Sequence, residues 1–151
     1  MKIFQASLHL NVLKRYHALF PSEPLNVLVS LAYNQGERGD FLTTYRHMMD
    51  ELIADSGAWS VSRGTFDMTV EQVIATLKLC GNQFDRYFNF DTDFSDKGFE
   101  NNISHQIQME NAGLEPIPVV HNFFDDEITY YVESDKYEWL ALGSTQSSNF
   151  D

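Results

Sequence analysis

The feature that most constrains the fold of this sequence is an alternation between short apolar runs and longer stretches with helical spacing. The longer stretches place apolar side chains three or four residues apart, which is typical of helices that bury one face. The apolar runs have the length of strands and span Lys2–Ala6, Leu25–Leu31, Leu52–Asp55, Tyr87–Asp91, Ile117–His121 and Trp139–Gly143. The pattern therefore predicts a strand–helix unit repeated five times and followed by a sixth strand.

Boundary residues support the predicted helices. These helices centre on residues 10–20, 42–52, 70–80, 99–110 and 128–135. Asp40 is a good N-cap for the second, and Thr69 with Gln72 fits a capping box at the start of the third. Gly113 and Pro116 stop the fourth, because glycine adopts the left-handed conformation and proline cannot continue a helix.

The strands predict an α/β fold with a parallel sheet. The segments NVLVSL, PIPVVH and WLALGS are nearly continuously apolar, as in strands covered on both faces by helices. With 151 residues the chain has the size of one domain. A complete (β/α)8 barrel needs roughly 200–250 residues. We therefore expect a single (β/α)-repeat domain over residues 1–151, either a partial TIM-barrel-like fold of about six strands and five helices or an open doubly wound sheet.

Charge and composition narrow the function classes. The chain has 22 acidic and 10 basic residues, a net charge of −12, which disfavours non-specific binding of nucleic acid and leaves a specific nucleic-acid partner open. Cys80 is the single cysteine, so an internal disulfide and a multi-cysteine zinc site are excluded. No apolar run is long enough to span a membrane, and the first residues predict a strand rather than a signal peptide. We expect a cytoplasmic protein without a membrane partner.

Polar residues follow three successive predicted strands where each one ends. Asp55, Asp91 and His121 occupy these positions, and the carboxyl ends of parallel strands gather at one rim. Two neighbouring carboxylates raise each other's pKa, so one can act as an acid while the other acts as a base or nucleophile. The same trio is also a ligand set for a divalent metal, which leaves a metal-dependent hydrolase as an alternative. The sequence has no glycine-rich phosphate loop and no H-E-x-x-H pattern, so we expect no cofactor and assign no metal ligand.

Four short motifs carry a resemblance to a known family. Asp55–Ser60 resembles the DSGGF-type motif of the tRNA-guanine transglycosylase superfamily, and is similar to the DSGAF version in a branch common in phages and bacteria. That branch also shows N-x-D, P-V-x-H and A-L-G-G segments, matched here by Asn89–Asp91, Pro118–His121 and Ala141–Ser144. The motifs occur in the same order across essentially the whole chain.

The resemblance implies a TIM barrel that binds a guanine-like base and exchanges or removes it at its glycosidic carbon. It implies catalytic roles for Asp55 and Asp91, which would contact the base and manage its protons. The residues that it implies for substrate binding are Ser56, Gly57, Trp59, Asn89, His121 and Gly143. The expected partner is thus a small base or nucleotide-sized ligand, in the host cytoplasm if the protein is encoded by a phage.

The match covers the amino-terminal portion of the family's barrel. The nucleophilic aspartate and the Cys/His zinc site of the transglycosylases belong to later strands, and Ser144 replaces the second glycine of A-L-G-G. The resemblance therefore implies a ligand-binding rim, with transglycosylase or glycosylase chemistry if further strands or a partner complete the barrel. An open barrel has two unpaired edges, so we expect a homo-oligomer. The alternative is a non-catalytic, truncated interaction protein that self-associates.

Overall fold

The computed structural model describes residues 2–6, 8–32, 38–95, 97–122 and 126–143. The strands are β1 (Phe4–Ala6), β2 (Leu25–Ser30), β3 (Met49–Asp55), β4 (Arg86–Tyr87), β5 (Val119–Val120) and β6 (Ala141–Leu142). The helices are α1 (Leu10–Leu19), α2 (Arg38–Leu42), α3 (Ala58–Ser62), α4 (Val70–Cys80), α5 (Gly98–Asn111) and α6 (Asp126–Glu133), with 3-10 turns η1 (Arg46–Met48) and η2 (Gly81–Gln83). The predicted alternation of strands and helices and the α/β class are confirmed.

All strand pairs are parallel and follow the order of the chain. One sheet has the order β1-β2-β3-β4, and β5 pairs with β6 in a second sheet. A parallel bridge between Phe88 and Ile117 connects the segment after β4 to the segment before β5. A doubly wound sheet reverses its strand order at a switch point, whereas the described strands show no reversal.

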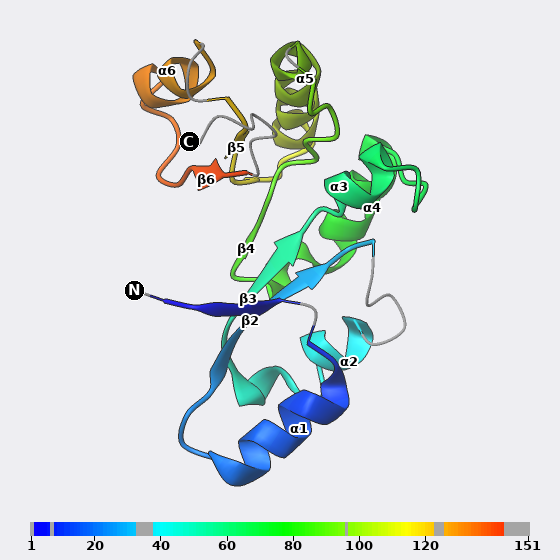
Figure 1. The fold of residues 1–151 in the computed structure, drawn as a ribbon, viewed down its shortest axis with the longest axis vertical. Helices are drawn as coiled ribbons and strands as arrows, with labels where there is room; N and C mark the ends of the chain where they lie inside the picture. Colours follow the sequence, from blue (N-terminus) through cyan, green and yellow to red (C-terminus); the bar gives the residue numbers. More distant parts are fainter. Residues whose placement is uncertain (1, 7, 33–37, 96, 123–125, 144–151) are drawn as a thin grey trace, which may run out of the picture.

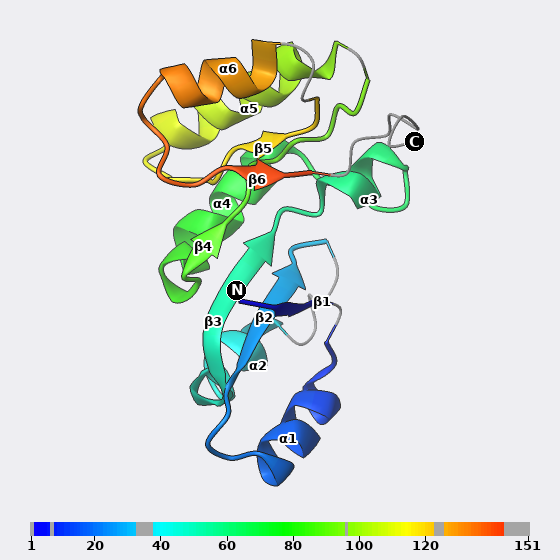
Figure 2. The ribbon, with the colours of Figure 1, turned by 60° about the vertical axis from the view of Figure 1, so that its left-hand side comes forward.

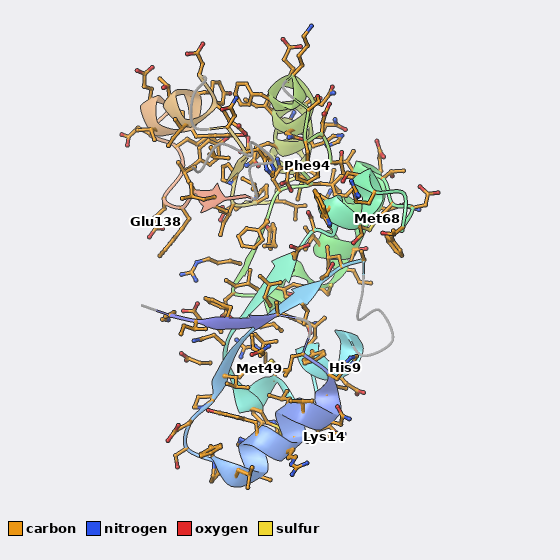
Figure 3. All side chains as sticks on the ribbon, viewed as in Figure 1. His9, Lys14, Met49, Met68, Phe94 and Glu138 are labelled. Atoms are coloured by element: carbon orange, nitrogen blue, oxygen red, sulfur yellow. The ribbon has the colours of Figure 1, made fainter. Side chains whose placement is uncertain are left out.

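Helices lie at both ends of the molecule, and α3 and α4 lie between the two ends (Figures 1 and 2). Figures 1 and 2 show α1 and α2 at one end, beside β2 and β3, and α5 and α6 at the other end, beside β5 and β6. In Figure 3 Met49 lies at the first of these ends, whereas Phe94 lies toward the second. β3 runs between them, and its last residues carry the chain toward the loops that follow β4 and β5.

The core forms around the central strands. Leu13 of α1, Val27 of β2, Leu52 of β3 and Val73 of α4 are completely buried in one cluster. Burying a large aliphatic side chain contributes about 1.5–3 kcal/mol. The capping box that starts α4 is confirmed, since the Thr69 hydroxyl accepts from the Gln72 N–H and the Gln72 side chain accepts from the Thr69 N–H.

The second predicted helix is wrong. The pattern over residues 42–52 predicts a helix, but α2 ends at Leu42 and β3 begins at Met49. Arg46 donates to the carbonyl oxygens of Met49 and Asp50, which holds the turn between the two elements. Pairing with β2 over residues 49–55 decides the conformation, because tertiary contacts override a weak local preference.

The other differences are smaller. α3 was not predicted, and the paired parts of β4, β5 and β6 are shorter than the apolar runs around them. No helix in the described part of the chain combines the length and the apolar character needed to cross a membrane.

Candidate functional site

A cavity of about 250 Å³ lies at the carboxyl ends of β3, β5 and β6 and beside the loop after β4. The residues of the sequence prediction that line it are Asp55, Ser56, Trp59, Asp91, His121 and Gly143. They are separated by as many as 88 positions in the sequence, and the parallel topology brings them to one rim. The expectation that both carboxylates and the imidazole share one cavity is confirmed by this arrangement.

Asp55 ends β3 and is held by neutral donors. The Gly57 N–H donates to Asp55 Oδ1 at 2.6 Å, and the Ser30 hydroxyl of β2 donates to the same carboxylate. Burial raises the pKa of Asp55, while the two hydrogen bonds oppose that rise without cancelling it. Asp55 therefore retains its proton to a higher pH than an exposed aspartate.

Gly57 makes the turn behind Asp55 possible. Its φ angle is +82°, in the left-handed region that residues with a Cβ avoid. A Cβ at this position would lie 2.5 Å from the Cβ of Ala32, which follows β2. The turn starts α3, which carries Trp59 to the wall of the cavity, but Gly57 itself does not line it. Gly57 therefore shapes the turn, and the predicted contact between Gly57 and a ligand stays a prediction.

Asp91 and His121 form a hydrogen-bonded pair in the wall of the cavity. His121 Nε2 lies 2.5 Å from Asp91 Oδ2, and Asp91 is buried. Burial raises the pKa of Asp91 most strongly, the imidazole opposes this rise, and the charge of Asp55 adds to it. The two carboxylates therefore influence each other's protonation, as two acids in one cavity do.

The His121 ring is fixed by its surroundings. A Cβ on Gly143 would lie 2.5 Å from His121 Cε1, so only glycine allows β6 to pass this close to the ring. Phe94 contacts the ring edge to face, with centroids 4.7 Å apart. Glu127 of α6 accepts from the N–H groups of His121 and Asn122 at 3.1 and 2.9 Å, which fixes the backbone. Gly143 thus lies against the His121 ring and also lines the cavity, and the ligand contact that the resemblance implies for it stays a prediction.

Aromatic side chains supply the apolar part of the wall. Trp59 and Phe94 pack edge to face with centroids 5.2 Å apart, and Trp59 remains 47% exposed at the rim. Asn102 of α5 anchors the loop that carries Phe94, because its amide bonds both the N–H and the carbonyl of Asp93. Neither Phe94 nor Glu127 was predicted from the sequence, and no spacing rule distinguishes them from ordinary loop and helix residues.

Asn89 is not brought to the cavity. It is completely buried, and its side chain donates to the Asn102 carbonyl and accepts from the Phe90 N–H. The bond to Asn102 joins the segment after β4 to α5. Asn89 therefore supports the loop between them instead of facing a ligand.

The described residues contain no group of three or more His, Cys, Asp or Glu side chains that could hold a metal ion. Asp91 and His121 are bonded to each other, and Asp55 is bonded to backbone and hydroxyl donors.

Comparisons of the chain with protein-family models, with curated proteins and with solved structures found no match. The likeness of Asp55–Ser60 and the three later motifs to the transglycosylase superfamily stays an interpretation of the sequence. The fold and the site together define an α/β protein with a small cavity at the carboxyl ends of parallel strands.

Proposed function

We propose that the protein binds a nucleobase or nucleoside in the cavity formed by the ends of β3, β5 and β6. The observation that carries this proposal is that Asp55, Asp91 and His121 line one small cavity together with aromatic side chains. Ligand sites for drug-sized molecules are typically about 300–1,000 Å³, so a cavity of about 250 Å³ suits a single small ring system.

The chemistry of the wall matches a planar heterocycle with polar edges. Carboxylates accept hydrogen bonds from ring N–H and amino groups, and a protonated carboxyl group also donates to a ring nitrogen or carbonyl. Trp59 and Phe94 offer the apolar surface that a ring face or edge needs. A guanine-like base presents adjacent N–H donors beside a carbonyl, which is the combination that Asp55 and Asp91 are suited to recognise.

We also propose that the domain is part of a (β/α) barrel of the transglycosylase-like kind. Sequential parallel strands and a site at their carboxyl ends support this architecture. In this proposal the chain supplies base recognition and proton management through Asp55 and Asp91. Base exchange or cleavage of a glycosidic bond requires an attacking group from further strands or from a partner.

Calorimetric titration with guanine tests the binding proposal. We expect Asp55→Asn to weaken binding about 10- to 100-fold, because hydrogen bonds to a charged group contribute about 1.5–3 kcal/mol. Asp50→Asn is the matched control, since Asp50 is exposed near the start of the same strand. Wild-type protein that fails to bind guanine, or equal affinities of the Asp55→Asn variant and the wild type, would reject the proposal.

Exposed apolar residues at the edge of the sheet favour a second candidate, self-association. Among the described strands β1 pairs only with β2, and Ile3 beside it is 73% exposed. An unpaired edge is a template for another strand, and a second copy offers the same edge. We therefore propose a homo-oligomer formed through β1.

Light scattering after size-exclusion chromatography tests the oligomer. Ile3→Lys should shift the mass to that of the monomer, because a charge at the edge opposes pairing. Leu79→Lys is the control, since Leu79 is 84% exposed on α4 and does not belong to the sheet edge. A monomeric wild-type protein, or an oligomer that survives Ile3→Lys, would contradict this candidate.

A further inference from the structure

A second cavity, the α5 cleft, lies at the amino ends of β5 and β6. It is formed by the end of α5, by residues 113–118 before β5 and by residues 136–139 before β6. Its volume is about 720 Å³, within the range of about 300–1,000 Å³ that is typical of small-molecule sites. None of the described residues that line it lines the candidate site at the carboxyl ends of the strands. The α5 cleft is therefore a separate place where a ligand can bind.

The charged side chains in the wall of the α5 cleft are three carboxylates and one ammonium group. Glu110 pairs with Lys136, and it also accepts from the hydroxyl of Tyr137 at 2.8 Å. Glu115 and Glu138 are exposed, and no described residue pairs with either carboxylate. The wall thus has an excess of two negative charges, on the two side chains that are still able to take a cationic partner.

The backbone of the same wall presents acceptors rather than donors. The Glu115 N–H donates to the Tyr87 hydroxyl at 2.9 Å, and the Ile117 N–H donates to the Tyr87 carbonyl at 2.8 Å. Pro116 and Pro118 have no N–H. The wall also contains the carboxyl end of α5, where helix carbonyl groups carry partial negative charge. An anion therefore receives no backbone hydrogen bond from residues 115–118, whereas a cation meets favourable dipoles.

Aromatic rings complete the wall, and cations of this chain already lie over them. The Arg86 guanidinium is 4.4 Å from the centroid of the Trp139 ring, and the Lys136 ammonium is 5.2 Å from that of Tyr137. Aromatic faces attract cations in this geometry. Arg86 also pairs with Glu51, and Trp139 is still 51% exposed. The exposed part of Trp139 thus offers apolar contact to a ligand from solution.

We propose that the α5 cleft binds a small organic cation, an ammonium group carried on an apolar or aromatic body. Glu115 and Glu138 hold the ammonium group, and Trp139 contacts the body. The volume of the cleft, its two unpaired carboxylates and its aromatic wall all fit this class of ligand. The inference does not depend on base binding, because the two cavities have different walls.

Calorimetric titrations of the full chain with tryptamine and indole-3-acetate test the inference. The two ligands share an indole ring and carry opposite charges at pH 7. At low salt we expect tryptamine to bind at least about 10-fold more tightly, because the carboxylates attract one ligand and repel the other. The difference should shrink as salt is added, since screening weakens both effects. Equal affinities, or no binding of tryptamine, would overturn the inference.

Charge-neutral variants identify the side chains that hold the cation. The double variant Glu115→Gln/Glu138→Gln should bind tryptamine about 3- to 30-fold more weakly, because it loses two exposed ion pairs. Glu133→Gln is the matched control, since Glu133 is exposed at the end of α6 and outside the cleft. Wild-type affinity in the double variant would overturn the inference.

The Asp55→Asn variant distinguishes the α5 cleft from the candidate site, which also contains carboxylates and a tryptophan. This variant should bind tryptamine as tightly as the wild type does. A loss of tryptamine binding in Asp55→Asn would place the ligand in the candidate site and overturn the inference. Guanine binding that depends on Asp55 is measured separately, so the failure of either proposal leaves the other testable.

Discussion

Replacing Gly57 with alanine tests how the Asp55 turn is held against the neighbouring strand. The backbone at Gly57 has φ +82°, and holding an L-residue in the left-handed region costs about 1–2 kcal/mol. The new Cβ would also lie 2.5 Å from the Ala32 Cβ and 3.0 Å from the Ala32 nitrogen, and overpacking of this kind typically costs about 1–3 kcal/mol. The two effects together predict a loss of about 2–5 kcal/mol in the free energy of unfolding.

Gly113→Ala is the matched control for this experiment. Gly113 has the same φ of +82°, but a Cβ there would have no atom within 4 Å among those considered. This variant should lose only the conformational part, about 1–2 kcal/mol. The unfolded chain loses the same conformational entropy in both substitutions, so that effect cancels in the comparison. Urea unfolding followed by circular dichroism measures both losses. Equal losses in the two variants would refute the close approach of Ala32, which follows β2, to the turn.

Three further predictions concern protonation and local support. Burial raises the pKa of Asp55 above its ordinary value of 3.8, so the folded state binds more protons than the unfolded state and stability falls as pH rises from that value to the raised pKa. The melting temperature of the Asp55→Asn variant minus that of the wild type should therefore be larger at pH 7 than at pH 3. An equal difference at the two pH values would contradict this prediction. Asp50→Asn is the control. Glu127→Ala should lower the free energy of unfolding by about 1–3 kcal/mol, because the N–H groups of His121 and Asn122 lose their acceptor. Glu127→Gln should restore part of this loss. Denaturant unfolding that shows no loss for Glu127→Ala would contradict the role of Glu127 in holding this backbone. Thr69→Ala should cost about 1 kcal/mol by removing the cap of α4, as measured by urea unfolding, and an unchanged midpoint would contradict the capping box.

Residues at the ends of predicted strands could be placed from the sequence because topology constrains them. Asp55, Asp91 and His121 each follow an apolar run, and parallel strands bring such positions to one rim whatever the details of the helices between them. Knowing the strands was therefore sufficient to group these side chains.

Local conformation between the strands was less predictable. The apolar residues around Met48 and Leu52 fit a helical period, but pairing with β2 makes Met49–Asp55 a strand. Sequence periodicity does not show whether a neighbouring strand is available for pairing. Only the three-dimensional context therefore decides between a helix and a strand for this segment.

The supporting residues of the site depend on contacts that no motif encodes. Phe94 reaches His121 because Asn102 anchors its loop, and Glu127 reaches the backbone of His121 from another helix. Asn89 shows the converse, since it lies in a motif at a strand end but its amide is used by Asn102 and Phe90. A position at a strand end predicts that a residue lies near the rim of the sheet. The hydrogen-bond partners of its side chain decide whether that side chain faces the cavity.

A crystal structure of the protein soaked with guanine tests the central claim most directly. The account predicts a planar ligand in the cavity, with Asp55 and Asp91 in hydrogen-bond contact with its polar edge and Trp59 or Phe94 against its ring. A base bound instead in the cleft between the end of α5 and residues 136–139, or a cavity that stays empty at saturating guanine, would contradict it.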